Sequence, residues 1–120
     1  MKFYQDMRDA VFEEILEIAK RDKKVIILTA DQGAQTFEKF KNQIPDQLIN
    51  VGVAEQNMIG VASGMAKENF KVFVYAIIPF VTLRCLEQIK IDLCYQDVDV
   101  TIITCGGSLE YSALGCIKES

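Results

Sequence analysis

Four short, largely apolar runs, separated by segments with helical patterning, constrain the fold of this chain more than any other feature of its sequence. The runs are VIILTA (25–30), LINVGV (48–53), KVFVYAII (71–78) and VDVTIITC (98–105). Strands that are apolar on both faces are typical of a parallel sheet covered by helices on two sides. Because parallel neighbours need a long crossover connection, usually a helix, the alternation predicts a three-layer α/β domain with a mainly parallel sheet.

The intervening segments carry apolar residues at helical spacing. We expect helices over 3–18, 35–41, 55–68 and 82–95. The basic run 20–24 suits the carboxyl end of the first helix, Pro45 marks a loop, and Pro79 ends the third strand. Gly60 and Gly64 in the third helix are expected to let its backbone approach a neighbouring element closely.

The composition narrows the class of protein. The 120 residues allow one domain, 1–120, and the net charge of -4 argues against non-specific nucleic-acid binding. No stretch approaches the roughly 20 apolar residues that span a bilayer, and the start of the chain is unlike a secretory signal. We therefore expect a cytoplasmic protein that binds neither nucleic acid nor membranes.

Cysteine and histidine usage excludes several kinds of site. The four cysteines, Cys85, Cys94, Cys105 and Cys116, lie 9, 11 and 11 residues apart without a CxxC pair, so we expect buried free thiols in a reducing compartment. The sequence has no histidine, which removes Ser-His-Asp and Cys-His hydrolases and argues against a zinc site. Any proton transfer then depends on carboxylates, Lys, Tyr, Cys or a cofactor.

Ligands of open α/β sheets bind in the loops that follow the carboxyl ends of the strands. In this chain those loops are 31–33, 54–56, 78–80 and 106–108, and none matches a GxGxxG or GxxxxGK[ST] pattern. From the residues alone, Glu55 is either a functional acid or a helix-start carboxylate favoured by the helix dipole. Phe80 is by default a core aromatic.

Three stretches add to this interpretation: NVGVAEQNMIGVASGMA (50–66), VYAIIPFVTLRCLEQIKIDLCYQ (74–96) and GGSLEYSALG (106–115). Together they resemble the pyrimidine-binding domain of transketolase-like enzymes that depend on thiamine diphosphate. The resemblance is strongest to the shorter bacterial transketolases and to split C-terminal subunits. It runs from about Asp31 to Gly115, with the spacing between the stretches preserved.

The resemblance implies a catalytic role for Glu55. In that family the equivalent glutamate hydrogen-bonds N1′ of the cofactor's aminopyrimidine ring and favours the imino tautomer, which deprotonates C2 of the thiazolium ring. A carboxyl group among Val51, Val53 and Met58 is partly desolvated, which favours a shared or donated proton. We expect no charged partner near Glu55, because such a partner would hold it ionised.

The resemblance also implies cofactor contacts for three further residues. Phe80 lies where the family stacks an aromatic ring on the aminopyrimidine. Many relatives carry a second aromatic three residues earlier, and here that position is Ile77. Asp31 lies where relatives have an acid near the cofactor cleft and a subunit contact. Arg84 is expected to make structural contacts on its helix, and the alternative is that it faces an anionic group of the substrate.

Two features that the resemblance calls for are missing from the sequence. The ALG motif is followed by 116–120 rather than by a Thr-His segment that contacts the sugar, and no Gly-Asp-Gly…Asn metal-binding motif is present. The domain is therefore expected to be incomplete, with no metal site of its own. A diphosphate-binding subunit or domain would hold Mg²⁺ or Ca²⁺, in a dimer or similar assembly.

The resemblance implies two-carbon ketol transfer between sugar phosphates, with no activity for the chain alone. Within the same fold, deoxyxylulose-phosphate synthase and the β subunit of a 2-oxo acid dehydrogenase are alternatives. A different kind of alternative is a non-catalytic fragment or relic that keeps the fold and the dimer surface.

Overall fold

The computed structural model describes residues 7–107 and has helices and strands in alternation. In chain order the elements are α1 (Met7–Ala19), β1 (Val25–Thr29), α2 (Phe37–Gln43), η1 (Pro45–Gln47), β2 (Leu48–Asn50), α3 (Glu55–Lys67), β3 (Lys71–Ile77), α4 (Ile78–Val81), α5 (Leu86–Gln88), η2 (Ile89–Tyr95) and β4 (Val100–Cys105). Within the described residues one sheet has the strand order β2-β1-β3-β4, and every neighbouring pair is parallel. The predicted α/β fold is confirmed.

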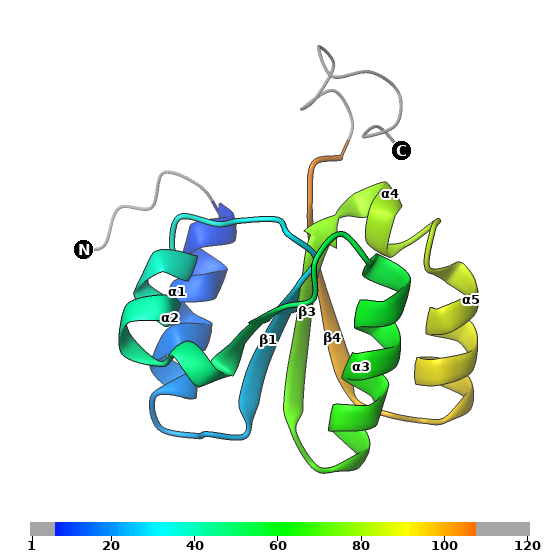
Figure 1. The fold of residues 1–120 in the computed structure, drawn as a ribbon, viewed down its shortest axis with the longest axis horizontal. Coiled ribbons are helices and arrows are strands. Elements are labelled where there is room, and N and C mark those ends of the chain that lie inside the picture. The colour runs from blue at the N-terminus through cyan, green and yellow to red at the C-terminus, as the bar shows by residue number, and fades with distance from the viewer. Residues whose placement is uncertain (1–6, 108–120) are drawn as a thin grey trace.

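Helices cover both faces of the sheet, with α1 and α2 on one side and α3 and α5 on the other (Figure 1). All five residues of β1 are buried, and their side chains alternate between the two layers. Val25 and Ile27 pack with α1 and α2, whereas Ile26 and Leu28 pack with α3. A strand that is buried on both faces accounts for the continuous apolar run in the sequence.

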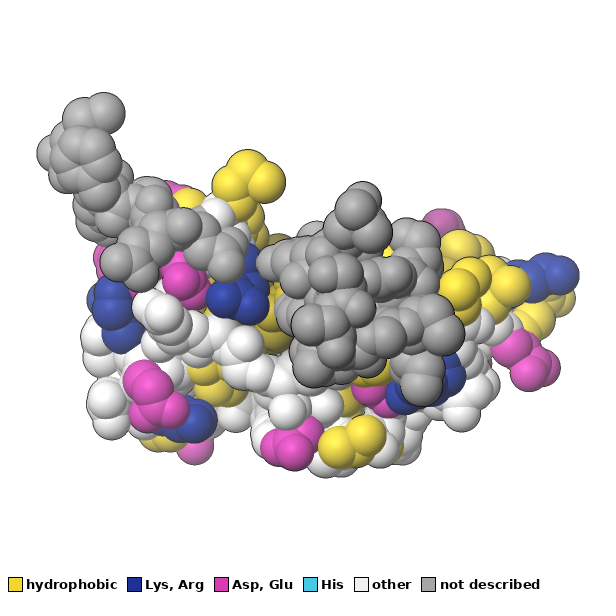
Figure 2. Space-filling model, turned by 90° about the horizontal axis from the view of Figure 1, so that it is seen from above, with side chains coloured by type: hydrophobic (Ala, Val, Ile, Leu, Met, Phe, Trp, Pro, Cys, Tyr) yellow, Lys and Arg dark blue, Asp and Glu magenta, His cyan; other side chains and the backbone are white. Residues whose placement is uncertain are grey.

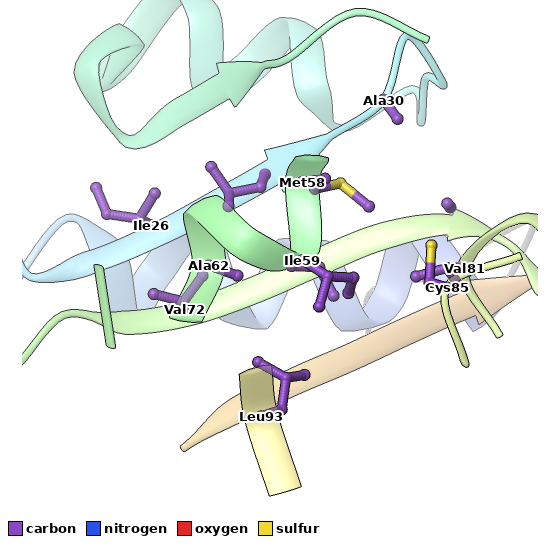
Figure 3. Close-up of a cluster of buried hydrophobic side chains, with 12 residues drawn as sticks. Ile26, Ala30, Met58, Ile59, Ala62, Val72, Val81, Cys85 and Leu93 are labelled. Carbon is purple, nitrogen blue, oxygen red and sulfur yellow. The ribbon is translucent and has the colours of Figure 1, made fainter. Parts of the chain in front are cut away.

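Each face of the sheet has its own hydrophobic cluster. On the α1 side, the Phe12 ring contacts the Phe37 and Tyr75 rings edge-on, with centroids 4.8 and 5.0 Å apart. On the α3 side, Met58 and Ile59 are fully buried against the strands, as the close-up in Figure 3 shows. The two clusters place the amino end of α3 beside the carboxyl ends of β1 and β3.

Several predicted boundaries are wrong by a few residues. The second strand ends at Asn50 because Gly52 turns the chain with a φ of 77°. The third ends at Ile77, where Pro79 occupies the first turn of the short helix α4. The fourth begins at Val100, two residues later than expected.

The predicted helix 82–95 is also corrected. Residues 82–85 form turns, and the helix begins only at Leu86 before continuing as the π-helical segment η2. The Thr82 hydroxyl donates to the Ile78 carbonyl at 2.7 Å, so the side chain closes the end of α4. Because residues 82–85 form turns, Arg84 takes a position that it would not have in a continuous helix over 82–95.

The expected close approach at Gly60 and Gly64 is not observed. Both glycines lie on the exposed face of α3, and a Cβ atom built on either would meet no atom of a neighbouring element within 4 Å. The side of α3 that packs on the sheet instead carries Met58, Ile59 and Ala62. No helix within residues 7–107 combines the length and the apolar character that crossing a membrane requires.

Candidate functional site

The carboxyl ends of β1, β2 and β3 meet at one edge of the sheet, where the amino end of α3 also lies. Figure 2 looks onto this end of the molecule, where charged side chains of both signs lie beside hydrophobic ones. Thr29, Asn50 and Ile77 are the last residues of the three strands. The loops that the sequence predicted to bind ligands therefore lie side by side, as expected for an open parallel sheet.

Glu55 is the first residue of α3 and is only 3% exposed. Removing a carboxylate from water is costly unless donors replace the lost hydration. Its Oε1 accepts a hydrogen bond from Gln32 Nε2 at 3.4 Å, and its Oε2 accepts one from Arg84 Nη1 at 3.0 Å. The start of a helix adds a favourable dipole, so the fold supplies three sources of positive potential.

The ion pair with Arg84 corrects the expectation that Glu55 has no charged partner. The two residues are 29 positions apart in the sequence, and the turns after α4 bring them together. The Arg84 backbone N–H donates to the Pro79 carbonyl at 3.1 Å, and its carbonyl accepts from Gln56 Nε2 at 2.9 Å. These two hydrogen bonds of the Arg84 backbone hold its guanidinium group at the amino end of α3.

Phe80 lies in α4 and is half-buried. The guanidinium carbon of Arg84 lies 4.3 Å from the centroid of its ring, within the range of a cation–π contact. Arg84 therefore touches both Glu55 and Phe80, the two residues that the sequence interpretation assigned to the aminopyrimidine ring. The structure brings these two together through Arg84, for which contacts on its own helix or with an anionic substrate group were expected.

Ile77 and Asp31 lie at the same edge but contact different partners. The Ile77 side chain is buried, and its backbone N–H donates to Gln32 Oε1 at 2.6 Å. Asp31 is exposed and has a φ of 60°, a conformation that Asp tolerates better than most residues. Asp31 exchanges two hydrogen bonds with Asn50, at 2.9 and 3.1 Å, and so fastens the end of β1 to the end of β2.

A hollow of about 240 Å³ opens beside this pair of strand ends. Its lining residues are Thr29, Asp31, Gln32, Gly33, Phe37, Lys41, Leu48 and Asn50. Asp31 therefore borders the hollow, which lies at the ends of β1 and β2. Glu55 and Phe80 lie on the other side of Gln32, toward the end of β3. Gln32 connects the two halves of the edge.

Sequence reasoning missed Gln32 and Asn50 as parts of the site. Gln32 lies in the predicted loop 31–33, and that position was the available signal, whereas Asn50 lay inside the predicted strand 48–53 and ends the strand only in the structure. A carboxamide can donate and accept at once, which suits it to bridge a backbone N–H and a carboxylate. The pairing itself could not be predicted because the partners are 19 and 23 residues apart.

The cysteines match the prediction only in part. Among the described residues, Cys85 is a buried free thiol, Cys105 is partly buried, and Cys94 is exposed. Burial, together with the charge of Glu55, raises the pKa of Cys85 from 9.0 to about 11. Cys85 is thus a protonated thiol near neutral pH, and its Sγ donates to the Phe80 carbonyl at 3.2 Å; Cys116 lies outside the described residues.

Comparison with known proteins extends these observations. The family model for the transketolase pyrimidine-binding domain matches residues 4–116. One subunit of the apulose-4-phosphate transketolase from Phocaeicola vulgatus is 36% identical over 114 residues, which cover 94% of this chain and 36% of the relative. A 1-deoxy-D-xylulose-5-phosphate synthase from Clostridium perfringens is 36% identical over 91 residues, covering 75% of this chain and 14% of the relative.

A solved structure shows the same fold. It is a split-gene transketolase in an inactive beta4 tetramer, and it aligns with a TM-score of 0.74 at 27% identity, over 83% of this chain and 34% of that chain. The chain belongs to the family of transketolase pyrimidine-binding domains. It spans about a third of the length of the transketolase relatives that it matches.

Proposed function

We propose that this chain supplies the pyrimidine-binding half of a transketolase-like active site. The enzyme would use thiamine diphosphate to transfer a two-carbon ketol unit between sugar phosphates. The observation that carries the proposal is the buried Glu55 at the start of α3, inside the region that the family model matches and paired with Arg84, which also lies over the Phe80 ring. Together they offer a carboxyl group and an aromatic surface to one planar, nitrogen-containing ring.

The donor set around Glu55 fits an aminopyrimidine. A carboxylate has about four lone-pair sites, and the two hydrogen bonds from Gln32 and Arg84 use one on each oxygen. Either oxygen can therefore still accept a hydrogen bond from a ring N–H or share a proton. Phe80 would stack against the ring, and Ile77 and Asp31 would border it more distantly.

When bound, thiamine diphosphate supplies a nucleophilic carbon that amino-acid side chains do not offer. In this proposal Glu55 holds a proton between its carboxyl oxygen and N1′ of the pyrimidine ring. Arg84 and Gln32 keep the carboxyl group oriented, and Phe80 excludes water from that contact. Pre-set orientation of this kind is what a protein contributes to cofactor chemistry.

A second polypeptide or domain is needed for a complete site in this proposal. The Phocaeicola relative is itself a single subunit of its transketolase, and the solved neighbour is a split-gene protein in an inactive assembly. We assign the diphosphate contacts and a Mg²⁺ or Ca²⁺ ion to a diphosphate-binding partner, in a dimeric or larger assembly. The chain alone is then expected to be inactive.

Deoxyxylulose-phosphate synthesis is the second candidate, because the Clostridium perfringens relative is also 36% identical. Its match covers less of this chain than the match to the transketolase subunit, 75% against 94%, which favours ketol transfer. Relatives that are transketolase subunits and synthases do not favour a non-catalytic relic. For location we propose the cytoplasm, since Cys85 is a buried free thiol, as is usual in reducing compartments.

The test is calorimetric titration of thiamine diphosphate and Mg²⁺ into the chain, alone and with a candidate diphosphate-binding subunit. The same titrations use Glu55→Ala and a matched control, Glu14→Gln, which changes an exposed glutamate on α1. We expect saturable binding and ketol transfer only with the partner, with transfer lost in Glu55→Ala and retained in Glu14→Gln. Full transfer activity in Glu55→Ala would refute the proposed role of Glu55.

A further inference from the structure

The side-chain amide of Gln32 joins three parts of the site. Its Oε1 accepts a hydrogen bond from the backbone N–H of Ile77 at 2.6 Å, at the end of β3. Its Nε2 donates to Oε1 of Glu55 at 3.4 Å. Its own backbone carbonyl accepts a hydrogen bond from the Thr29 hydroxyl at 2.5 Å, which fixes the loop that carries it.

The orientation of this amide is determined by its partners. A backbone N–H is only a donor, so the atom that faces Ile77 must be the amide oxygen. The amide nitrogen then necessarily faces Glu55 and donates to its Oε1. A flipped amide would place two donors together on one side and two acceptors on the other.

This arrangement holds the two oxygens of Glu55 by different donors. Oε1 meets the neutral amide of Gln32, whereas Oε2 meets the cationic guanidinium group of Arg84. The terminal torsion of a glutamate is broad, so one partner alone would leave the carboxyl plane free to rotate. With both partners present, rotation of that plane breaks at least one hydrogen bond.

We propose that Gln32 is a positioning residue for Glu55, which sets the plane of the carboxyl group that is offered to the pyrimidine ring. This inference rests on the proposed function. Gln32 acts from the loop after β1, through one anchor on the β3 backbone, on a side chain at the start of α3. It therefore joins the three elements whose relative placement defines the site.

Gln47 provides a comparison within the same chain. It is buried, whereas Gln32 is half-buried, and its Nε2 donates to the backbone carbonyls of Ala19, Asp22 and Val25 at 2.9, 3.0 and 2.9 Å. These contacts lie at the amino end of β1, the end opposite to Glu55. Gln47 is thus a matched control for the structural cost of losing a buried glutamine amide.

Two substitutions separate positioning from anchoring. Gln32→Glu keeps an oxygen acceptor for the Ile77 N–H but replaces the donor to Glu55 by a second carboxylate. Gln32→Met keeps the approximate shape and removes both hydrogen bonds. Gln47→Met serves as the stability control, and each variant is studied in the full chain together with its diphosphate-binding subunit.

The main readout is the rate of hydrogen–deuterium exchange at thiazolium C2 with saturating thiamine diphosphate and Mg²⁺, which measures proton removal without turnover. We expect both Gln32 variants to slow this exchange by about 10- to 100-fold, the loss typical of removing a hydrogen-bond partner that orients a metal ligand. Gln47→Met should lower the melting temperature and leave the exchange rate within about twofold. Exchange at the wild-type rate in Gln32→Glu would overturn the inference and leave Gln32 as an anchor of β3.

A cofactor-free readout distinguishes this failure from failure of the proposed function. In the ¹⁵N-labelled chain, the side-chain amide resonances of Gln32 should shift in Glu55→Ala but not in Glu14→Gln. Unshifted resonances in Glu55→Ala would overturn the Gln32–Glu55 contact itself. Absence of cofactor binding by the wild-type complex, with the amide shift present, would instead overturn the proposed function and with it the role of Gln32 in that function.

Discussion

The ion pair between Arg84 and Glu55 yields the sharpest quantitative prediction. Two unit charges 3.0 Å apart attract by roughly 5 kcal/mol at an effective dielectric constant of about 20. The desolvation of Glu55, which is 3% exposed, offsets much of this attraction, and the Arg84 side chain remains 44% exposed. We therefore expect a coupling free energy of about 1–3 kcal/mol between the two side chains.

A double-mutant cycle measures this coupling. The free energy of unfolding is determined by urea titration for the wild-type chain, Arg84→Met, Glu55→Gln and the double variant. The matched control is the cycle Lys41→Met and Glu38→Gln, which removes an ion pair with a shorter 2.7 Å contact but with side chains 61% and 71% exposed. For that exposed pair we expect a coupling below about 0.5 kcal/mol.

The comparison separates burial from distance. If contact distance determined the strength of an ion pair, the Lys41–Glu38 pair would couple at least as strongly as the Arg84–Glu55 pair. If burial of the carboxylate determines the strength of an ion pair, the Arg84–Glu55 pair couples more strongly than the Lys41–Glu38 pair. A coupling for Arg84 and Glu55 no larger than the control would refute this account of how the site holds its acid.

Two further predictions concern stability. Gly60→Ala and Gly64→Ala should each raise the free energy of unfolding by about 0.5–1 kcal/mol, because both positions are helical and open; a lower melting temperature in either variant would contradict this. The pKa of Cys85 is about 11 in the folded chain, against 9.0 for an ordinary thiol. The thiol therefore makes its full contribution to stability below about pH 9, and this contribution is lost as the pH rises to about 11. The free energy of unfolding should therefore fall more steeply between these pH values in the wild-type chain than in Cys85→Ala, and equal slopes in urea titrations at each pH would contradict the assignment.

Local patterning accounts for the part of the structure that was predicted correctly. The apolar run of β1 is buried on both faces, and the amphipathic pattern of α1 places Phe12 and Leu16 on the sheet. These features depend on side chains that are near one another in the chain. The spacing at which apolar side chains recur indicates whether they form a helix or a strand. The order of such elements then limits the topology, because parallel strands need crossovers.

The errors lie where contacts between distant segments decide the local structure. The predicted helix 82–95 is interrupted because the chain turns after α4, where the Arg84 backbone bonds to Pro79 and to the Gln56 side chain. Cys94 was expected to be buried among apolar neighbours but lies on the exposed side of η2. Sequence spacing alone does not say which face of a short, irregular helix meets the sheet.

The sequence by itself determined the α/β fold, the family, and the presence of an acid at the start of α3. Only the tertiary structure decided what surrounds that acid. Gln32 and Arg84 reach Glu55 from positions 23 and 29 residues away, and no periodic pattern marks either of them. Elements are encoded by neighbours in the chain, whereas the hydrogen bonds of a buried carboxylate depend on which loops the packed sheet and helices bring to the same edge.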